Sequence, residues 1–225
     1  MISEKYKCIF IHIPKTAGQS IENFFLKLHD LTWDERAQLL LRYNPDPALG
    51  PESLAHLKAS EYTGLDYISC EDFQSYFKFA FVRNPWSRLV SEYLYRNLDK
   101  KTSFKDYVMY GLPPKDSYND KYRHIEPQYN YLHNGSGNLM VDFVGKFESL
   151  QTDFDKICAS LDILDSKLPH VNASKKKSFK SRIKKIISTS KLPKKHYAEY
   201  YDEELKDIVG KIFAKDISAF NYTFQ

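Results

Sequence analysis

Residues 8–28 read CIFIHIPKTAGQSIENFFLKL, and this stretch predicts a strand, a tight loop and a helix. Its first part, residues 8–13, is a short and mostly apolar run that is typical of a strand covered on both faces. Apolar side chains then recur at helical spacing, so a helix is expected to begin near Gln19 or Ser20. The loop between strand and helix consists of Pro14, Lys15, Thr16, Ala17 and Gly18.

This loop and the start of the helix have the chemistry of an anion receptor. The first turn of a helix presents unpaired N–H groups and partial positive charge, and Lys15 with the hydroxyls of Thr16 and Ser20 would lie beside it. Gly18 would let the backbone approach a ligand closely. A phosphate or sulfate group suits such a receptor, although many strand–turn–helix units bind nothing. The pattern differs from the nucleotide P-loop because Lys15 precedes the only glycine of the loop.

A second strand and helix are predicted in residues 76–95, which read YFKFAFVRNPWSRLVSEYLY. Pro85 is well placed as the first residue of the helix, and Arg83 stands at the end of the preceding strand. Ser91 follows within about two turns of that helix. Arg83 and Ser91 could together hold a second phosphate group, because the forked donors of arginine suit such contacts. Ligands of open α/β sheets lie beyond the carboxyl ends of the strands, where both stretches place their polar residues.

The remaining chain continues the alternation of strands and helices. Strand–helix alternation favours a mainly parallel sheet between layers of helices. We therefore expect an α/β fold formed by a single domain over residues 1–225, a length sufficient for a hydrophobic core. The further predicted strands are residues 53–57 and 141–147, and the further predicted helices are residues 31–43, 59–62, 104–110, 152–161 and parts of 197–225.

Composition narrows the class of protein and its compartment. No run of about 18 apolar residues occurs, so we expect no transmembrane helix, and the start of the chain lacks the apolar region of a signal peptide. Cys8, Cys70 and Cys158 are scattered and form no C-x-x-C pair, which argues against a zinc site and a disulfide framework. We expect a reducing, cytoplasmic location.

Residues 166–198 differ sharply from the rest of the chain. They contain eleven Lys and Arg residues and no Asp or Glu; without those eleven, the 33 basic residues of the chain fall to 22, against 29 acidic ones. Phe179, Ile183, Ile186 and Ile187 fall on one helical face, so a basic amphipathic segment is predicted. It would be a solvated helix face or a cationic wall over an anionic ligand, and attraction to a membrane surface or a nucleic acid is also physically open.

The two predicted anion-binding stretches resemble the carbohydrate-type (Golgi-like, family 2) sulfotransferases. Residues 12–20, HIPKTAGQS, are similar to that family's loop for the 5′-phosphosulfate of 3′-phosphoadenosine 5′-phosphosulfate (PAPS). Residues 81–93, FVRNPWSRLVSEY, are similar to its 3′-phosphate segment, and weaker similarity continues through residues 124–132, 141–150 and 168–174. Golgi members carry an N-terminal anchor and more cysteines, so this chain resembles a compact soluble member.

This resemblance implies a fold and a set of site residues. The fold would be a three-layer α/β/α sandwich like that of P-loop NTPases, with a central, mainly parallel sheet. No metal is implied, because lysine and helix N–H groups would supply the positive field. The residues that it assigns to PAPS are Lys15, Thr16, Ala17, Gly18, Gln19 and Ser20 for the 5′-phosphosulfate, Arg83 and Ser91 for the 3′-phosphate, and, more weakly, Asn172, Ser174 and Lys175.

Two histidines are candidates for the base that sulfuryl transfer to an alcohol requires. His56 lies between the two anion-binding stretches, as the catalytic histidine of the family does, and would emerge at an edge of the sheet. His124 follows a polar loop and could act as the base or position the acceptor with Glu126 and Gln128. His12 lies inside the first predicted strand, and we interpret it as structural.

The predicted reaction moves a sulfuryl group from PAPS to an acceptor hydroxyl, with Lys15 neutralising charge on the departing oxygen. The resemblance implies a carbohydrate or glycolipid acceptor, and a small alcohol or phenol is an alternative. Two other functions stay open. A P-loop-like nucleoside or small-molecule kinase would share the sheet and loop but would need magnesium. A noncatalytic basic module would bind polyanions through residues 166–198. The sequence does not favour nucleic acid as a partner, and it leaves the oligomeric state open.

Overall fold

The apolar runs predicted as strands form the centre of the fold in a computed structural model, which describes residues 1–169 and 195–225. Strand β2 (Cys8–Ile11) pairs in parallel with β3 (Phe77–Val82), and β3 pairs in parallel with β4 (Phe143–Lys146). The short strand β1 (Ile2–Ser3) runs antiparallel to β2, so the sheet has the order β1-β2-β3-β4. The prediction of a mainly parallel sheet is confirmed.

Helices surround this sheet on the described part of the chain. Helix α4 begins at Pro85, as predicted, and the Asn84 side chain accepts a hydrogen bond from the backbone N–H of Ser87. The described α-helices are α1 (Gly18–Leu28), α2 (Ala59–Gly64), α3 (Cys70–Ser75), α4 (Pro85–Tyr95), α5 (Phe104–Tyr110), α6 (Asp120–Ile125), α7 (Tyr129–Leu132), α8 (Leu150–Ser160), α9 (Glu203–Ile212) and α10 (Ala214–Phe220).

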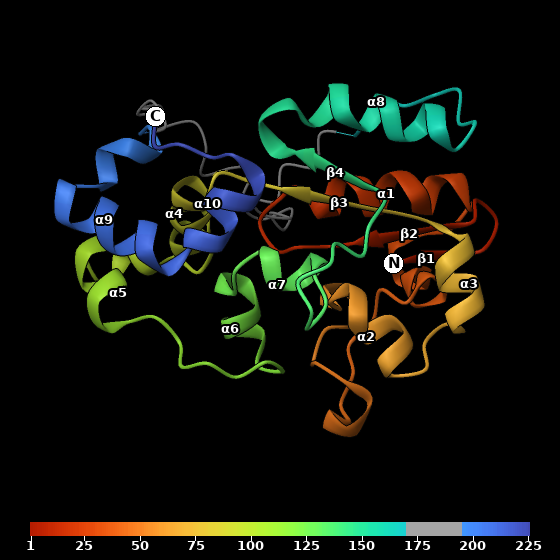
Figure 1. Cartoon of the computed structure of the whole chain (residues 1–225), viewed down its shortest axis with the longest axis horizontal. Helices are drawn as coiled ribbons and strands as arrows, with labels where there is room; N and C mark the ends of the chain where they lie inside the picture. The colour runs from red at the N-terminus through yellow and green to blue at the C-terminus, as the bar shows by residue number, and fades with distance from the viewer. Residues whose placement is uncertain (170–194) are drawn as a thin grey trace, which may run out of the picture.

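Both faces of the sheet are covered (Figure 1). Helices α1 and α8 pack on one face, and α2, α3 and α7 pack on the other. Because neighbouring side chains of a strand point to opposite faces, Phe79 and Phe81 of β3 enter the core with α1 and α8, whereas Ala80 and Val82 enter the second core. The predicted arrangement of three layers, helices–sheet–helices, is therefore confirmed.

A third cluster of buried side chains lies beyond the carboxyl ends of the strands. Helices α4, α5 and α9 meet there, with Trp86, Tyr107 and Val209 among the buried residues. Figure 1 shows these helices grouped at the end of the sheet toward which β3 points. This cluster fixes the start of α4, which is separated from Arg83 only by the N-cap residue Asn84.

One local prediction was wrong, and another differs in the type and length of the helix. Residues 53–57 form no strand: Leu54–His56 is a single 3₁₀ turn (η3), preceded by an isolated bridge between Tyr43 and Ser53. Leu54 and Leu57 both reach the core, a spacing of three residues that a turn allows and a strand does not. The helix predicted over residues 31–43 is a 3₁₀ helix, η1 (Trp33–Leu39), which ends where Leu40 takes a left-handed φ of 64°.

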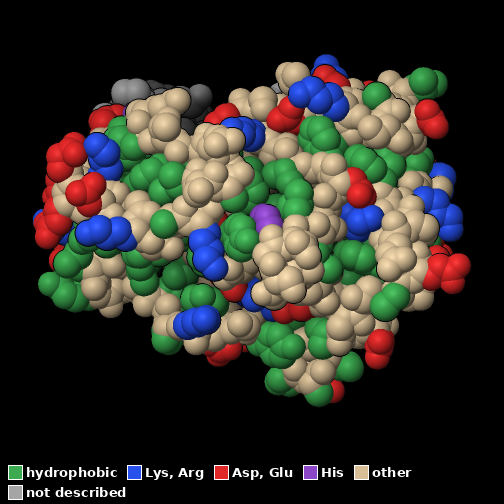
Figure 2. Space-filling model, viewed as in Figure 1, with side chains coloured by type: hydrophobic (Ala, Val, Ile, Leu, Met, Phe, Trp, Pro, Cys, Tyr) green, Lys and Arg blue, Asp and Glu red, His purple; other side chains and the backbone are tan. Residues whose placement is uncertain are grey.

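The surface of the described residues carries mixed charges. On the face shown in Figure 2, Lys and Arg side chains are scattered, whereas Asp and Glu side chains gather over α9. Most of the basic segment predicted over residues 166–198 falls outside the described residues. Among the helices of the two described ranges, none combines the length and apolar character needed to span a bilayer.

Candidate active site

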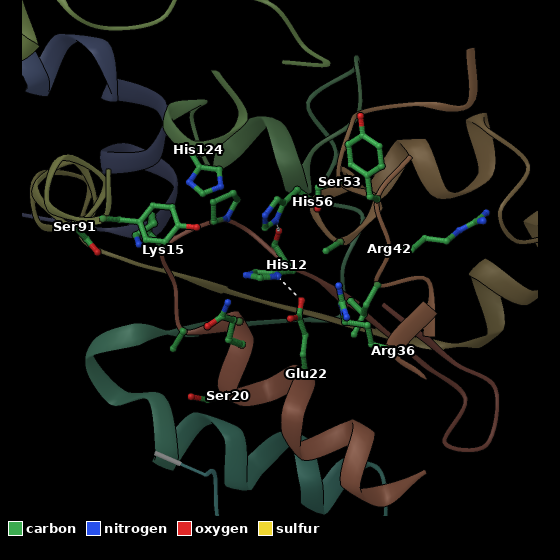
Figure 3. A pocket seen from close by; sticks show the side chains of 18 of the residues that line it. His12, Lys15, Ser20, Glu22, Arg36, Arg42, Ser53, His56, Ser91 and His124 are labelled. Atoms are coloured by element: carbon green, nitrogen blue, oxygen red, sulfur yellow. Dashed lines mark hydrogen bonds and ion pairs between the residues drawn. The ribbon is translucent and has the colours of Figure 1, made fainter. Parts of the chain in front are cut away.

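A cavity of about 610 Å³ opens beside the ends of β2 and β3, and the predicted anion-binding residues gather around it (Figure 3). Its size is typical of a small-molecule site. The lining residues from the predicted donor site are Lys15, Ala17, Gly18, Gln19, Ser20, Arg83 and Ser91; the candidate bases His56 and His124 also line it. The structure thus brings two distant stretches of the sequence to one cavity.

The loop between β2 and α1 keeps the helix start open toward this cavity. Lys15 and Ala17 take left-handed φ values of 73° and 71°, which non-glycine residues rarely adopt. Ala17 stands at the N-cap of α1 and offers no capping side chain, and the first turn contains no acidic residue. The N–H groups of Gly18 and Gln19 are therefore available to an anion, whereas that of Ser20 donates to the backbone oxygen of Ala17 at 3.0 Å.

Thr16 differs from its neighbours in the loop. Its side chain is buried, and its hydroxyl donates a hydrogen bond of 2.8 Å to the backbone oxygen of Ile13. The expectation that this hydroxyl faces the anion does not hold in the structure, because the left-handed residues on either side turn the side chain inward. Thr16 stabilises the loop, and Ser20 supplies the hydroxyl that lines the cavity.

Gly18 packs against a histidine. A Cβ atom on Gly18 would lie 1.9 Å from His12 Nε2, so the ring occupies the space that a side chain would need. His12 follows β2 directly, lines the cavity and forms a buried hydrogen bond with Glu22 of α1 through its Nδ1 atom. His12 was predicted to lie within the strand, but it comes just after it. Its imidazole contacts Gly18 and Glu22 and lines the cavity.

We expect Gly18→Ala to lower the free energy of unfolding by about 1–3 kcal/mol, the usual cost of overpacking a filled site. Gly64→Ala is the matched control, since a Cβ there would meet nothing within 4 Å. Urea unfolding of both variants measures the difference. Equal stability of the two variants would show that the His12 ring can move aside without cost.

The ammonium group of Lys15 packs against an aromatic ring in this structure. Its Nζ atom lies 3.7 Å from the centroid of the Tyr95 ring, a cation–π contact. Burial lowers the pKa of Lys15 to about 8; Glu92 opposes this decrease, and the charge of Arg83 adds to it. The ammonium group is therefore charged at neutral pH but only weakly hydrated, which favours its pairing with an anion.

Arg83 follows the last residue of β3, and its side chain reaches across to the loop between β2 and α1. Its guanidinium donates to Ser87 Oγ at 2.9 and 3.1 Å and to the backbone oxygen of Lys15 at 3.2 Å. Burial lowers the pKa of Arg83 to about 10, so the group stays charged at neutral pH. Ser91, one turn beyond Ser87 on α4, also lines the cavity. This edge therefore offers a second place for an anionic group.

His56 is held between two other imidazoles. The ring centroids of His12 and His124 lie 4.6 and 5.3 Å from that of His56, both edge to face. His56 Nδ1 lies 3.3 Å from the backbone oxygen of His12, and no hydrogen bond to Nε2 is present among the described residues. Burial, with the His12 and His124 rings, holds the pKa of His56 well below its usual range. The ring is therefore neutral at neutral pH and has a nitrogen available to accept a proton.

His124 lies on helix α6, not at the end of a long polar loop as expected. Its Nδ1 atom is 2.7 Å from Glu92 Oε2, and its ring stacks on Tyr95. Helix α6 begins at Asp120 because Asn119 caps it through hydrogen bonds from Lys121 and Tyr122. His124 is therefore more constrained than His56, with a carboxylate on Nδ1.

Glu126 and Gln128 do not face an acceptor, contrary to one interpretation of the sequence. Both side chains are buried. Gln128 holds the backbone of Arg83 on both sides, since its Oε1 accepts from Arg83 N and its Nε2 donates to Arg83 O, each at 2.8 Å. Glu126 Oε1 pairs with Lys58 Nζ at 2.7 Å. Gln128 and Glu126 therefore support the residues of the cavity wall from the protein interior.

Two buried arginines that we did not predict fix the loop and both histidines. Arg88 donates to the backbone oxygens of Pro14, Glu126 and His124 at 2.9–3.0 Å. Arg123 donates to the backbone oxygen of His56 at 2.6 Å. Each guanidinium ties segments that are far apart in the sequence, so the cavity wall is held together by charge-assisted hydrogen bonds.

The far end of the cavity, away from Lys15 and Arg83, is lined by a mixture of aromatic, apolar and charged side chains. Residues on either side of the loop at 44–51 contribute lining residues there. The lining residues at this end are Trp33, Arg36, Leu41, Arg42, Tyr43, Glu52, Ser53 and Ala55. The weaker PAPS candidates Asn172, Ser174 and Lys175 lie outside the described residues.

A loop at an open helix start, a strand-end arginine and a neutral histidine around one cavity suit a group transferase with an anionic donor. The family model described as "Sulfotransferase family" matches residues 1–223. The chain belongs to the sulfotransferase family, as its resemblance predicted, and the reaction of that family is sulfuryl transfer.

One relative extends the comparison to another organism. A protein of Archaeoglobus fulgidus, described as uncharacterized, is 33% identical to this chain over 98 residues. The matched part is 40% of this chain and 72% of the relative. No solved structure matches the chain.

Proposed function

We propose that the protein transfers the sulfuryl group of PAPS to an acceptor hydroxyl, on a carbohydrate or a related molecule. The observation that carries this proposal is the meeting of the Lys15 loop, Arg83 and His56 around one cavity. Lys15 and Arg83 supply the two separate cationic positions that a donor with a phosphosulfate and a second phosphate requires. His56 lies on the same cavity and supplies a base.

The donor would lie along the carboxyl ends of β2 and β3. Lys15, the N–H groups at the start of α1 and Ser20 would bind the 5′-phosphosulfate. Arg83 and Ser91 would bind the 3′-phosphate, which distinguishes this donor from ADP and from 5′-AMP. The Lys15 ammonium would leave the Tyr95 ring and pair with the phosphosulfate.

The proposed reaction is one in-line displacement at sulfur. The acceptor oxygen forms a bond to sulfur as the bond between sulfur and the bridging phosphate oxygen breaks, and the electron pair of that bond stays on the departing adenosine 3′,5′-bisphosphate. His56 Nε2 takes the proton of the acceptor hydroxyl, and Lys15 stabilises the charge on the bridging oxygen. Positioning and electrostatics dominate such a transfer, as in phosphoryl transfer.

The far end of the cavity supports a polar, ring-containing acceptor. Trp33 and Tyr43 offer partly exposed aromatic faces there, and Arg36 and Arg42 offer hydrogen-bond donors. Aromatic faces beside polar groups suit sugars, which combine C–H faces with hydroxyls. The three free cysteines, two of them buried, fit a reducing compartment such as the cytoplasm.

A transfer assay tests this function. In the presence of a metal chelator, the protein with PAPS and a panel of monosaccharides, oligosaccharides and simple alcohols is expected to release adenosine 3′,5′-bisphosphate together with a sulfated product. Mass spectrometry of the acceptor and chromatography of the nucleotide measure both products. Consumption of ATP with magnesium, while PAPS stays intact with every acceptor, would favour a kinase and contradict the proposal.

A further inference from the structure

His56, Asp120 and His124 bring three metal-binding side chains together at the wall of the cavity. Their ligand atoms all lie within 4.8 Å of one another, and His124 Nε2 is 3.6 Å from Asp120 Oδ1. Both histidines line the cavity (Figure 3), so an ion has access to them from solvent. Two imidazoles and one carboxylate form the protein ligand set of many open zinc sites.

Both imidazoles are oriented as metal-ligating histidines usually are. His124 Nδ1 lies 2.7 Å from Glu92 Oε2, and His56 Nδ1 lies 3.3 Å from the backbone oxygen of His12. A ligating histidine usually donates its other ring N–H to a carboxylate or a backbone carbonyl, which fixes its tautomer. Occupying Nδ1 in this way leaves the Nε2 atom of each ring available to an ion.

Two carboxylates, those of Glu92 and Asp120, lie beside the His124 ring. Glu92 and Asp120 share one arginine: Arg96 contacts Glu92 Oε1 through Nε and Asp120 Oδ2 through Nη2, the latter at 3.1 Å. Glu92 is buried, and a buried carboxylate is costly unless a cation neutralises it. Arg96 contacts Asp120 through Oδ2, so Oδ1, the oxygen nearest to His124 Nε2, stays available to a cation.

We propose that His56, Asp120 and His124 bind one Zn²⁺ ion, and that this ion inhibits the enzyme. Zinc–ligand distances of about 2.0–2.2 Å place tetrahedral ligands about 3.3 Å apart, close to the present separation of His124 Nε2 and Asp120 Oδ1. The Asp120 side chain is 32% exposed, so it can move to complete the site. Zn²⁺ on His56 Nε2 would occupy the lone pair that takes the acceptor proton.

Metal binding can be tested without the reaction. Co²⁺ is the probe, because tetrahedral Co²⁺ absorbs strongly in the visible range, and Zn²⁺ then displaces it. The chelator-treated full chain is expected to bind one Co²⁺ ion with tetrahedral bands that one equivalent of Zn²⁺ removes. Asp120→Asn and His124→Ala are each expected to weaken Zn²⁺ binding by at least about tenfold, as the loss of a ligand or its support does.

Matched variants separate this site from other metal-binding groups. Cys70→Ser removes an exposed thiol, and His196→Ala removes an exposed imidazole; both are expected to bind Zn²⁺ as the unaltered protein does. His124 is buried, so circular dichroism checks its variant, and the partly exposed Asp120 gives a second variant. Octahedral Co²⁺ spectra, or equal affinity in Asp120→Asn and Cys70→Ser, would overturn the site.

The inhibition rests on the proposed function, whereas the metal site does not. In the transfer assay, the Zn²⁺ concentration for half inhibition is expected to rise at least about tenfold in Asp120→Asn, in parallel with the binding constant. Zn²⁺ bound at one equivalent without inhibition would overturn the inhibitory role and remove His56 as the base. Absence of metal binding in an active enzyme would overturn the metal site alone.

Discussion

Replacing His56 with alanine is expected to lower kcat for sulfuryl transfer by about 10²–10⁴-fold, the usual contribution of a positioned general base. His56 is the base tested first because its ring lines the cavity with Nε2 unbonded among the described residues; His124, whose Nδ1 pairs with Glu92, is the alternative base. Affinity for adenosine 3′,5′-bisphosphate should stay within a few-fold, since the base contacts the acceptor and not the nucleotide. Initial rates and calorimetry measure the two effects separately.

His196→Ala is the matched control, because it removes an exposed imidazole away from the cavity lining. We expect it to keep the unaltered kcat. A His56→Ala enzyme with kcat near that of His196→Ala would contradict the role of His56. An equally large loss in His124→Ala with a fully active His56→Ala would move the base to His124.

Lys15→Ala is expected to lower kcat by about 10²–10³-fold, the loss seen when one group that stabilises developing charge is removed. The reason is the position of Lys15 at the open end of α1, where the bridging oxygen of the donor would lie. The alanine keeps the left-handed loop conformation that Ala17 already adopts nearby. Steady-state rates at saturating PAPS give the comparison.

Lys27→Ala controls for net charge, since Lys27 is an exposed lysine of α1, the helix that follows the Lys15 loop. The pH profile gives a second control: kcat/KM for PAPS should fall above about pH 8, where free Lys15 loses its proton. Lys15→Arg should move this decrease to higher pH, because arginine stays charged. A Lys15→Ala enzyme as fast as Lys27→Ala would refute the assignment.

Local patterns were sufficient to predict much of the fold. The buried strands over Cys8–Ile11 and Phe77–Val82 and the helix start at Pro85 depend on short apolar runs and on proline, which act through neighbouring residues. The loop from Lys15 to Ser20 was predicted as an anion receptor beyond the carboxyl ends of the strands, and its residues other than Thr16 line the cavity. The strand predicted over residues 53–57 was wrong, because the short apolar run at Leu54–His56 forms a 3₁₀ turn.

The support behind the site could not be predicted in the same way. Arg88 has backbone oxygens from three distant segments as partners, and Gln128 holds the backbone of Arg83. Such contacts depend on tertiary packing, which a single sequence does not show. One signal was present: Arg88 interrupts the apolar residues of α4, where a charged side chain must find buried partners. His12 is similar, because its partner Glu22 lies on the helix after the loop.

Calorimetric titration of the metal-free protein with adenosine 3′,5′-bisphosphate, ADP and 5′-AMP tests the donor site most directly. We predict that the bisphosphate binds at least about tenfold more tightly than ADP, a difference of about 1.4 kcal/mol. We also predict that Arg83→Ala abolishes this preference while Lys27→Ala keeps it. Equal affinity for the three nucleotides, or a preference that survives in Arg83→Ala, would contradict a PAPS site at this cavity.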